Sequence, residues 1–160
     1  MDRMGQFGER TNRKVSMEDF IPTSLAEIIQ DFQFCEGREK IELLIDYAES
    51  LPPLPDWLSE NHEKLEQVPE CMTPVFIQSE LQNGKLIFYF DVPPESPTVR
   101  GYASIVKKGL DGSTPEEVLR IPGDFFHAMG LQEVLTYQRL NGLSAILAHI
   151  KQLAAQAIKN

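Results

Sequence analysis

Residues 75–91, VFIQSELQNGKLIFYFD, decide the fold class. Their two halves are rich in β-branched and aromatic residues, and Asn83-Gly84 between them is a strong signal for a tight turn. We therefore predict a hairpin of two antiparallel strands. On both sides of this hairpin, apolar residues recur with the period of a helix. The sequence thus predicts an α+β domain in which a small antiparallel sheet packs against several helices.

Two helices are predicted before the hairpin. The first begins at Thr23 or Ser24, either of which can act as the N-cap, and its apolar residues have the i, i+3, i+4, i+7 spacing. The second ends near Leu51, because three of the next four residues are proline. Residues 52–74 then form a long connection with one helical turn within 56–64. Connections of this length tend to carry function.

Two long helices and a short one are predicted after the hairpin. Ser96 and Pro97 start the first long helix as its N-cap and first helical residue. Thr114 opens the capping box TPEE, which predicts the short helix. The longest helix begins near Tyr137, with Thr136 as its cap, and keeps a regular apolar face to the C-terminus.

The chain has 160 residues, about one domain at ~150 residues per domain. Residues 1–22 are polar and lack apolar periodicity, so we expect a disordered leader there and a single domain over 23–160. No apolar run approaches the ~20 residues of a membrane helix. The N-terminal stretch also lacks the apolar segment of a signal peptide. We therefore expect a cytoplasmic protein with no membrane partner.

The net charge of -9 argues against nucleic acid as a partner, because phosphate binding requires a surplus of basic groups. The charge is also unevenly placed along the chain. Residues 36–95 contain 13 acidic and 4 basic side chains, whereas residues 134–160 contain three basic side chains and no acidic one. This polarity is typical of a solvated acidic surface, or it steers the protein toward a basic partner.

The sequence predicts neither a disulfide framework nor a metal site. The two cysteines, Cys35 and Cys71, are too few for such a framework, and a reducing compartment keeps them as thiols. The three histidines are scattered, and neither cysteine lies in a CxxC or Cys/His cluster. Glycine-rich phosphate-binding motifs are missing from the sequence as well. We expect no cofactor.

Cys71 is the candidate reactive residue. It lies in VPECMTPVF (68–76), between two prolines at the end of the long connection, where a stiff loop can present a thiol to a partner's sulfur. Glu70 beside it disfavours the thiolate, and no basic residue lies within six positions, so activation must come through space. The alternative is that Cys71 is a small buried apolar residue. Cys35 continues an apolar stripe and is assigned to packing.

Two glycines within predicted helices are unexpected, since glycine there costs ~1 kcal/mol relative to alanine. Asn141-Gly142 lies near the start of the last helix, with Arg139 less than one turn away. Either another element packs closely there, or a loop such as the one bearing Cys71 approaches it. Arg100-Gly101 repeats the pattern in the helix after the hairpin. A shared cause and coincidence both remain open.

The order and spacing of six segments resemble the SufE-type family of sulfur acceptors. One of them, the cysteine loop, departs from the family pattern at Glu70, where glycine is usual, and at Met72-Thr73-Pro74. The six segments are REKIELLIDYAESLPPLP (38–55), VPECMTPVF (68–76), TVRGYASIV (98–106), STPEEVL (113–119), DFFHAMGLQEVL (124–135) and TYQRLNGLSAIL (136–147).

The resemblance implies a fold of the IscU/SufE type and a role in iron–sulfur cluster assembly. Cys71 would take persulfide sulfur from a pyridoxal-phosphate-dependent cysteine desulfurase, stimulate that enzyme and pass the sulfur to a cluster scaffold complex. No cofactor of its own is implied. The residues expected to border the cysteine loop or bind the partner are Glu70, Met72, Arg100, Gly101, Arg139, Asn141 and Gly142.

Two alternatives remain open at this point. The first is a non-catalytic binding or assembly module that keeps the fold but has an inert Cys71. The second is a free-standing thiol enzyme or redox sensor in which His127 serves as a base for Cys71. Whether the chain is an enzyme is left open, although a sulfur-carrying accessory protein is favoured.

Overall fold

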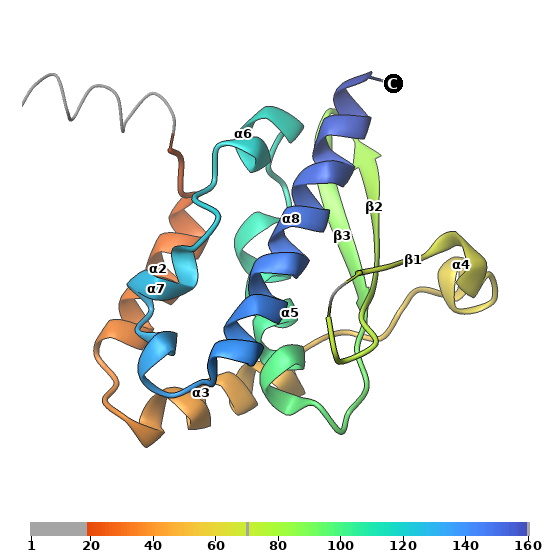
Figure 1. Ribbon diagram of the computed structural model, residues 1–160. Helices are drawn as coiled ribbons and strands as arrows, with labels where there is room; N and C mark the ends of the chain where they lie inside the picture. Colours follow the sequence, from red (N-terminus) through yellow and green to blue (C-terminus); the bar gives the residue numbers. More distant parts are fainter. Residues whose placement is uncertain (1–18, 70, 160) are drawn as a thin grey trace, which may run out of the picture.

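The computed structural model describes residues 19–69 and 71–159, which form a three-stranded antiparallel sheet packed against helices (Figure 1). The α+β class predicted from the sequence is confirmed. The strands are β1 (Glu66–Gln67), β2 (Phe76–Gln82) and β3 (Lys85–Asp91). The long helices are α2 (Thr23–Gln33), α3 (Arg38–Glu49), α5 (Pro97–Leu110) and α8 (Tyr137–Lys159). The short helices are α4 (Asp56–Ser59), η1 (His62–Lys64), α6 (Pro115–Leu119), α7 (Phe125–Ala128) and η2 (Leu131–Glu133).

The hairpin of β2 and β3 is the centre of the sheet. The strands pair in register from Phe76 opposite Asp91 to Gln82 opposite Lys85. Asn83 and Gly84 have φ values of 52° and 81°, so the tight turn places both residues in the left-handed region, as Asn-Gly predicts. The alternate side chains of β3 that face the helices are buried, which fixes the register of the hairpin.

The sheet has one more strand than the two predicted. Strand β1 pairs with the start of β2 through Glu66 opposite Ile77 and Gln67 opposite Phe76. It lies within the segment that the sequence assigns to a loop. A strand of two residues is too short to show an alternating apolar pattern in the sequence. It is recognised as a strand only by its pairing with β2.

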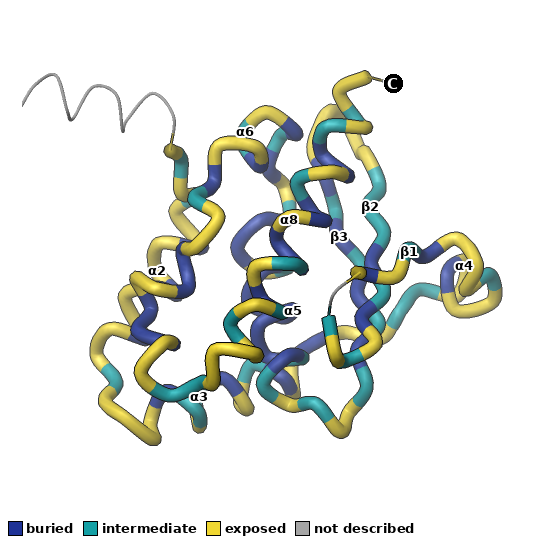
Figure 2. Tube along the Cα trace, in the orientation of Figure 1, coloured by how far each residue is buried: buried dark blue, intermediate teal, exposed yellow. Residues whose placement is uncertain are grey.

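Helix α5 is buried over most of its surface, as its dark blue trace shows (Figure 2). The backbone of Gly101 packs directly on α3, because a Cβ atom on Gly101 would lie 2.1 Å from the carbonyl oxygen of Leu44. A Cβ on Gly109 would lie 2.9 Å from the side chain of Leu25 in α2. The close approach of α3 and α2 to α5 therefore explains the glycines at positions 101 and 109.

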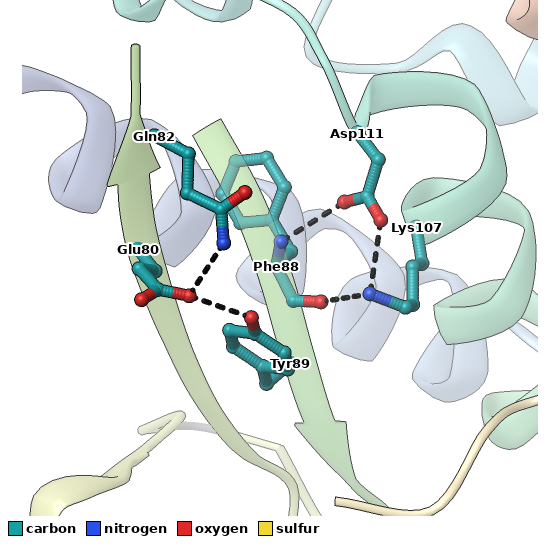
Figure 3. Close-up of polar contacts among 6 residues, drawn as sticks. All are labelled: Glu80, Gln82, Phe88, Tyr89, Lys107 and Asp111. Carbon is teal, nitrogen blue, oxygen red and sulfur yellow. Dashed lines mark hydrogen bonds and ion pairs between the residues drawn. The ribbon is translucent and has the colours of Figure 1, made fainter. Parts of the chain in front are cut away.

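Lys107 of α5 and Asp111, the C-cap residue of that helix, cover the outer edge of β3 at Phe88 (Figure 3). Asp111 accepts a hydrogen bond from the backbone N–H of Phe88 at 2.9 Å, and Lys107 donates to the carbonyl oxygen of the same residue. Lys107 and Asp111 also form an ion pair at 2.9 Å. This pair occupies the positions of a neighbouring strand's backbone groups, so it prevents edge-to-edge association at Phe88.

The N-terminal ends of the helices differ in part from the prediction. Pro22, rather than Thr23 or Ser24, occupies the N-cap position of α2, and the hydroxyl of Ser24 donates instead to the carbonyl oxygen of Gly109. The capping box at Thr114 is confirmed.

The predicted leader falls largely outside the described residues, which begin at Asp19. Within its described part, the backbone N–H of Phe20 donates to the carbonyl oxygen of Arg120 at 2.8 Å, so the chain is attached to the domain before α2 begins. No helix within residues 19–69 and 71–159 is long and apolar enough to cross a membrane.

The contact between α5 and α3 predicts the effect of adding one methyl group. Gly101→Ala should lower the free energy of unfolding by about 1–3 kcal/mol, because the backbone oxygen of Leu44 cannot move without displacing α3. Gly123→Ala is the matched control, since no atom lies within 4 Å of its added Cβ. Thermal unfolding measures both variants, and an unchanged Tm for Gly101→Ala would contradict the close packing.

Candidate functional site

Cys71 lies in the loop that joins β1 to β2, against the first turns of α8. The loop is closed at its base by a hydrogen bond from the N–H of Val68 to the carbonyl oxygen of Val75, 2.8 Å long. Cys71 is a half-buried free thiol. A Cβ on Gly142 would lie 3.5 Å from its Sγ, an ordinary van der Waals distance, so the sulfur lies close to this position of α8. Of the two explanations that the sequence offers for Gly142, the structure favours the approach of the cysteine loop.

A cavity of about 290 Å³ opens beside the Cys71 sulfur. It lies between the cysteine loop, the N-terminal turn of α5 and the start of α8. Met72 stands at the loop tip with 78% of its surface exposed. A volume of this size is at the small end of the range for ligand pockets. The lining residues are Cys71, Met72, Thr73, Val99, Thr136, Gln138, Arg139 and Gly142.

Hydrogen bonds hold the walls of this cavity together. The hydroxyls of Thr73 and Ser96 lie 3.2 Å apart, which connects the loop to the beginning of α5. Ser96 therefore bonds to the loop, and it makes no side-chain cap bond to its own helix. The guanidinium of Arg139 donates to the hydroxyl of Thr98 at 3.0 Å. Its backbone N–H donates to Thr136 at 3.2 Å, as the predicted cap requires.

Burial raises the pKa of the Cys71 thiol above its ordinary value. Two smaller influences act in the opposite direction, the backbone N–H of Thr73 and the positive charge of Arg139. No basic residue lies near Cys71 in the sequence, so an activating charge has to come from a distant segment. Arg139 is such a charge. The net effect keeps the sulfur protonated at neutral pH. Glu70, which the sequence identified as an opposing charge, lies outside the described residues.

Other predicted neighbours of Cys71 do not line the cavity. Arg100 donates to the carbonyl oxygen of Val92 at 2.7 Å, and Gly101 packs on α3. The two pairs of arginine and glycine thus have different physical causes. Asn141 is exposed and lines a separate hollow on the surface of α8.

His127 is exposed on α7, where its ring packs on Phe126 with centroids 4.8 Å apart. It is not among the residues that line the cavity. The geometry therefore does not support His127 as a base for Cys71.

Sequence reasoning missed a partly buried polar contact on the same helix. Nε2 of His149 on α8 lies 2.9 Å from a carboxylate oxygen of Glu66 in β1. The sequence carries no signal for this contact, because Glu66 and His149 lie 83 positions apart and belong to different elements. Within residues 19–69 and 71–159, no group of three or more His, Cys, Asp or Glu side chains is placed to hold a metal ion.

Comparison with known proteins places these features in a family. The family model for SufE, described as the Fe-S metabolism associated domain, matches residues 26–154. An uncharacterised SufE-like protein of Mycobacterium tuberculosis is 38% identical over 138 residues, which cover 86% of this chain and 95% of that protein. The cysteine desulfuration protein SufE of Plasmodium vivax is 24% identical over 158 residues, which cover 96% of this chain and 62% of that protein.

A solved structure has the same fold. The solution structure of a hypothetical protein from Thermus thermophilus matches with a TM-score of 0.78 and 34% identity, covering 88% of this chain and all of that one. The family match includes the loop of Cys71, the hairpin and the first turns of α8. The chain therefore belongs to the SufE family, whose domain is associated with iron–sulfur metabolism.

Proposed function

We propose that this protein is a sulfur acceptor in iron–sulfur cluster assembly and that Cys71 carries the sulfur. The observation that supports this most directly is the position of the Cys71 sulfur, on an exposed loop and beside a cavity that Arg139 also lines. Relatives named cysteine desulfuration proteins support the same role. The donor in this proposal is a pyridoxal-phosphate-dependent cysteine desulfurase, and the recipient is a cluster scaffold complex in the cytoplasm.

The transfer step is a thiol–persulfide exchange. The Cys71 thiol loses its proton, and the thiolate attacks the terminal sulfur of the cysteine persulfide on the desulfurase. A new S–S bond forms at Cys71 while the S–S bond of the donor breaks. The donor cysteine leaves as a thiolate and takes up a proton. One sulfur atom moves, no external oxidant is consumed, and Cys71 becomes a persulfide.

The raised pKa of Cys71 suits a carrier that should stay unreactive between transfers. Burial holds the sulfur as a thiol at rest, while the positive charge of Arg139 favours the anionic form needed for attack. The loop carries Met72, whose exposed side chain offers an apolar contact to a partner. In this proposal, binding of the desulfurase at the loop brings its persulfide to the sulfur, and Arg139 favours the thiolate that attacks it.

The alternative functions make different demands on the same residues. A redox sensor or free-standing thiol enzyme needs a thiol with a lowered pKa and a nearby base. Burial raises the pKa of Cys71, and His127 does not line its cavity. A binding module with an inert thiol needs only the surface of the loop. A variant without the Cys71 sulfur would therefore keep the function of a binding module but lose that of a sulfur acceptor.

Replacing Cys71 by serine should abolish sulfur acceptance, because a hydroxyl cannot form the S–S bond that carries the sulfur. Turnover of a cognate desulfurase should fall to that of the desulfurase alone, while the circular dichroism spectrum stays that of the wild type. Cys35→Ser is the matched control and should keep full stimulation. Full stimulation by Cys71→Ser would overturn the proposal in favour of the binding module.

The pH profile of alkylation tests the electrostatics of the site. Alkylation requires the thiolate, so a raised pKa predicts slow alkylation of Cys71 at neutral pH and acceleration as the pH rises toward that pKa. Arg139→Gln should raise the pKa further, because it removes the charge that favours the thiolate. Arg139→Lys keeps the charge and is the control. A Cys71 pKa below the ordinary range, or one insensitive to Arg139→Gln, would contradict this assignment.

A further inference from the structure

Glu66 and His149 join the segment that carries Cys71 to helix α8. Nε2 of His149 and Oε1 of Glu66 lie 2.9 Å apart. The histidine side chain is only 9% exposed, whereas that of Glu66 is 43% exposed. An ionised carboxylate only accepts hydrogen bonds, so the histidine ring donates. The buried ring nitrogen is thus satisfied by a residue five positions before the reactive cysteine.

The two ends of segment 66–71 contact the same face of α8. Gly142 and His149 are separated by two helical turns, or about 10 Å along the helix axis. Cys71 lies against Gly142, and Glu66 lies against His149. Glu66 and Cys71 thus lie along α8 in the order opposite to the helix, with Glu66 two turns beyond Cys71.

The two attachments differ in strength. A Cβ on Gly142 would lie at ordinary van der Waals distance from the Cys71 sulfur, and among the described residues a hydroxyl–hydroxyl bond joins Thr73 of the loop tip to Ser96. The contact of Glu66 with His149 is charge-assisted, and its loss leaves a buried ring nitrogen unpaired. Strand β1 adds only two residues of pairing. The stem of the loop is therefore held more firmly than its tip.

We infer that Glu66 and His149 are positioning residues for Cys71. They hold Glu66, five residues before the cysteine, on α8, so that the sulfur of Cys71 stays half-buried at rest. Neither residue is among those that line the cavity, so both act on Cys71 from outside it. This inference rests on the proposed function of Cys71 as a sulfur acceptor, and it adds the residues that control access to that sulfur.

The test compares alkylation of the two cysteines in one folded protein. Iodoacetamide is added at fixed pH, and peptide mass spectrometry follows the ratio of the rates at Cys71 and Cys35. Glu66→Ala should raise this ratio about tenfold. Loss of a charge-assisted hydrogen bond weakens the attachment to α8 and should expose the Cys71 sulfur to the reagent by roughly that factor. Glu63→Ala removes an exposed acidic side chain of the same connection and should leave the ratio unchanged.

Two further variants separate positioning from a general loss of stability. Glu66→Gln keeps a side chain of the same length with an oxygen that can accept the hydrogen bond from His149. Its ratio of alkylation rates at Cys71 and Cys35 should therefore be closer to the wild-type ratio than to that of Glu66→Ala. In a His149→Leu background, Glu66→Ala should have no additional effect, because the pair acts as a unit. Should Glu66→Ala fail to fold, Glu66→Asp replaces it, since its shorter side chain withdraws the carboxylate while keeping the charge.

An unchanged ratio in the folded Glu66→Ala or Glu66→Asp variant overturns the inference, as does an equal rise in Glu63→Ala. Loading of wild-type Cys71 by a desulfurase is measured in parallel. If the wild type is not loaded, the proposed function fails, whereas the alkylation ratios still decide whether Glu66 and His149 control exposure of the sulfur.

Discussion

The burial of helix α5 is the constraint on which the rest of the structure depends. Gly101 lets its backbone contact α3, and the pair of Lys107 and Asp111 closes the edge of β3. The same helix begins at the functional site, where Ser96 bonds to the loop of Cys71. One wall of the cavity is therefore an extension of the protein core.

The sequence predicts the long helices and the hairpin because their signals are local. Apolar residues recur with a helical period, and Asn83-Gly84 requires the left-handed backbone that the turn provides. Strand β1 is different, since its two residues become a strand only by pairing with β2. The burial of α5 on several sides also escapes prediction, because a single apolar stripe at helical spacing does not show how many elements surround a helix.

The site is predictable where an unusual residue marks a close approach. Glycine in α8 suggested that a loop approaches there, and the Cys71 sulfur lies against Gly142. The same argument at Gly101 led to a different partner, because a glycine shows that something is close without showing what it is. His149 carried no signal in the apolar face of α8, and its role became visible only with Glu66 placed opposite it. Pairings between distant segments are thus the part that one sequence does not reveal.

The central claim is that Cys71 receives sulfur while held beside the start of α8. Peptide mass spectrometry tests it most directly, after incubation of the wild-type protein with a cognate cysteine desulfurase, pyridoxal phosphate and cysteine under conditions that preserve persulfides. The account predicts one added sulfur on the peptide containing Cys71 and none on the peptide containing Cys35. An unmodified Cys71 in the presence of an actively turning-over desulfurase would contradict it.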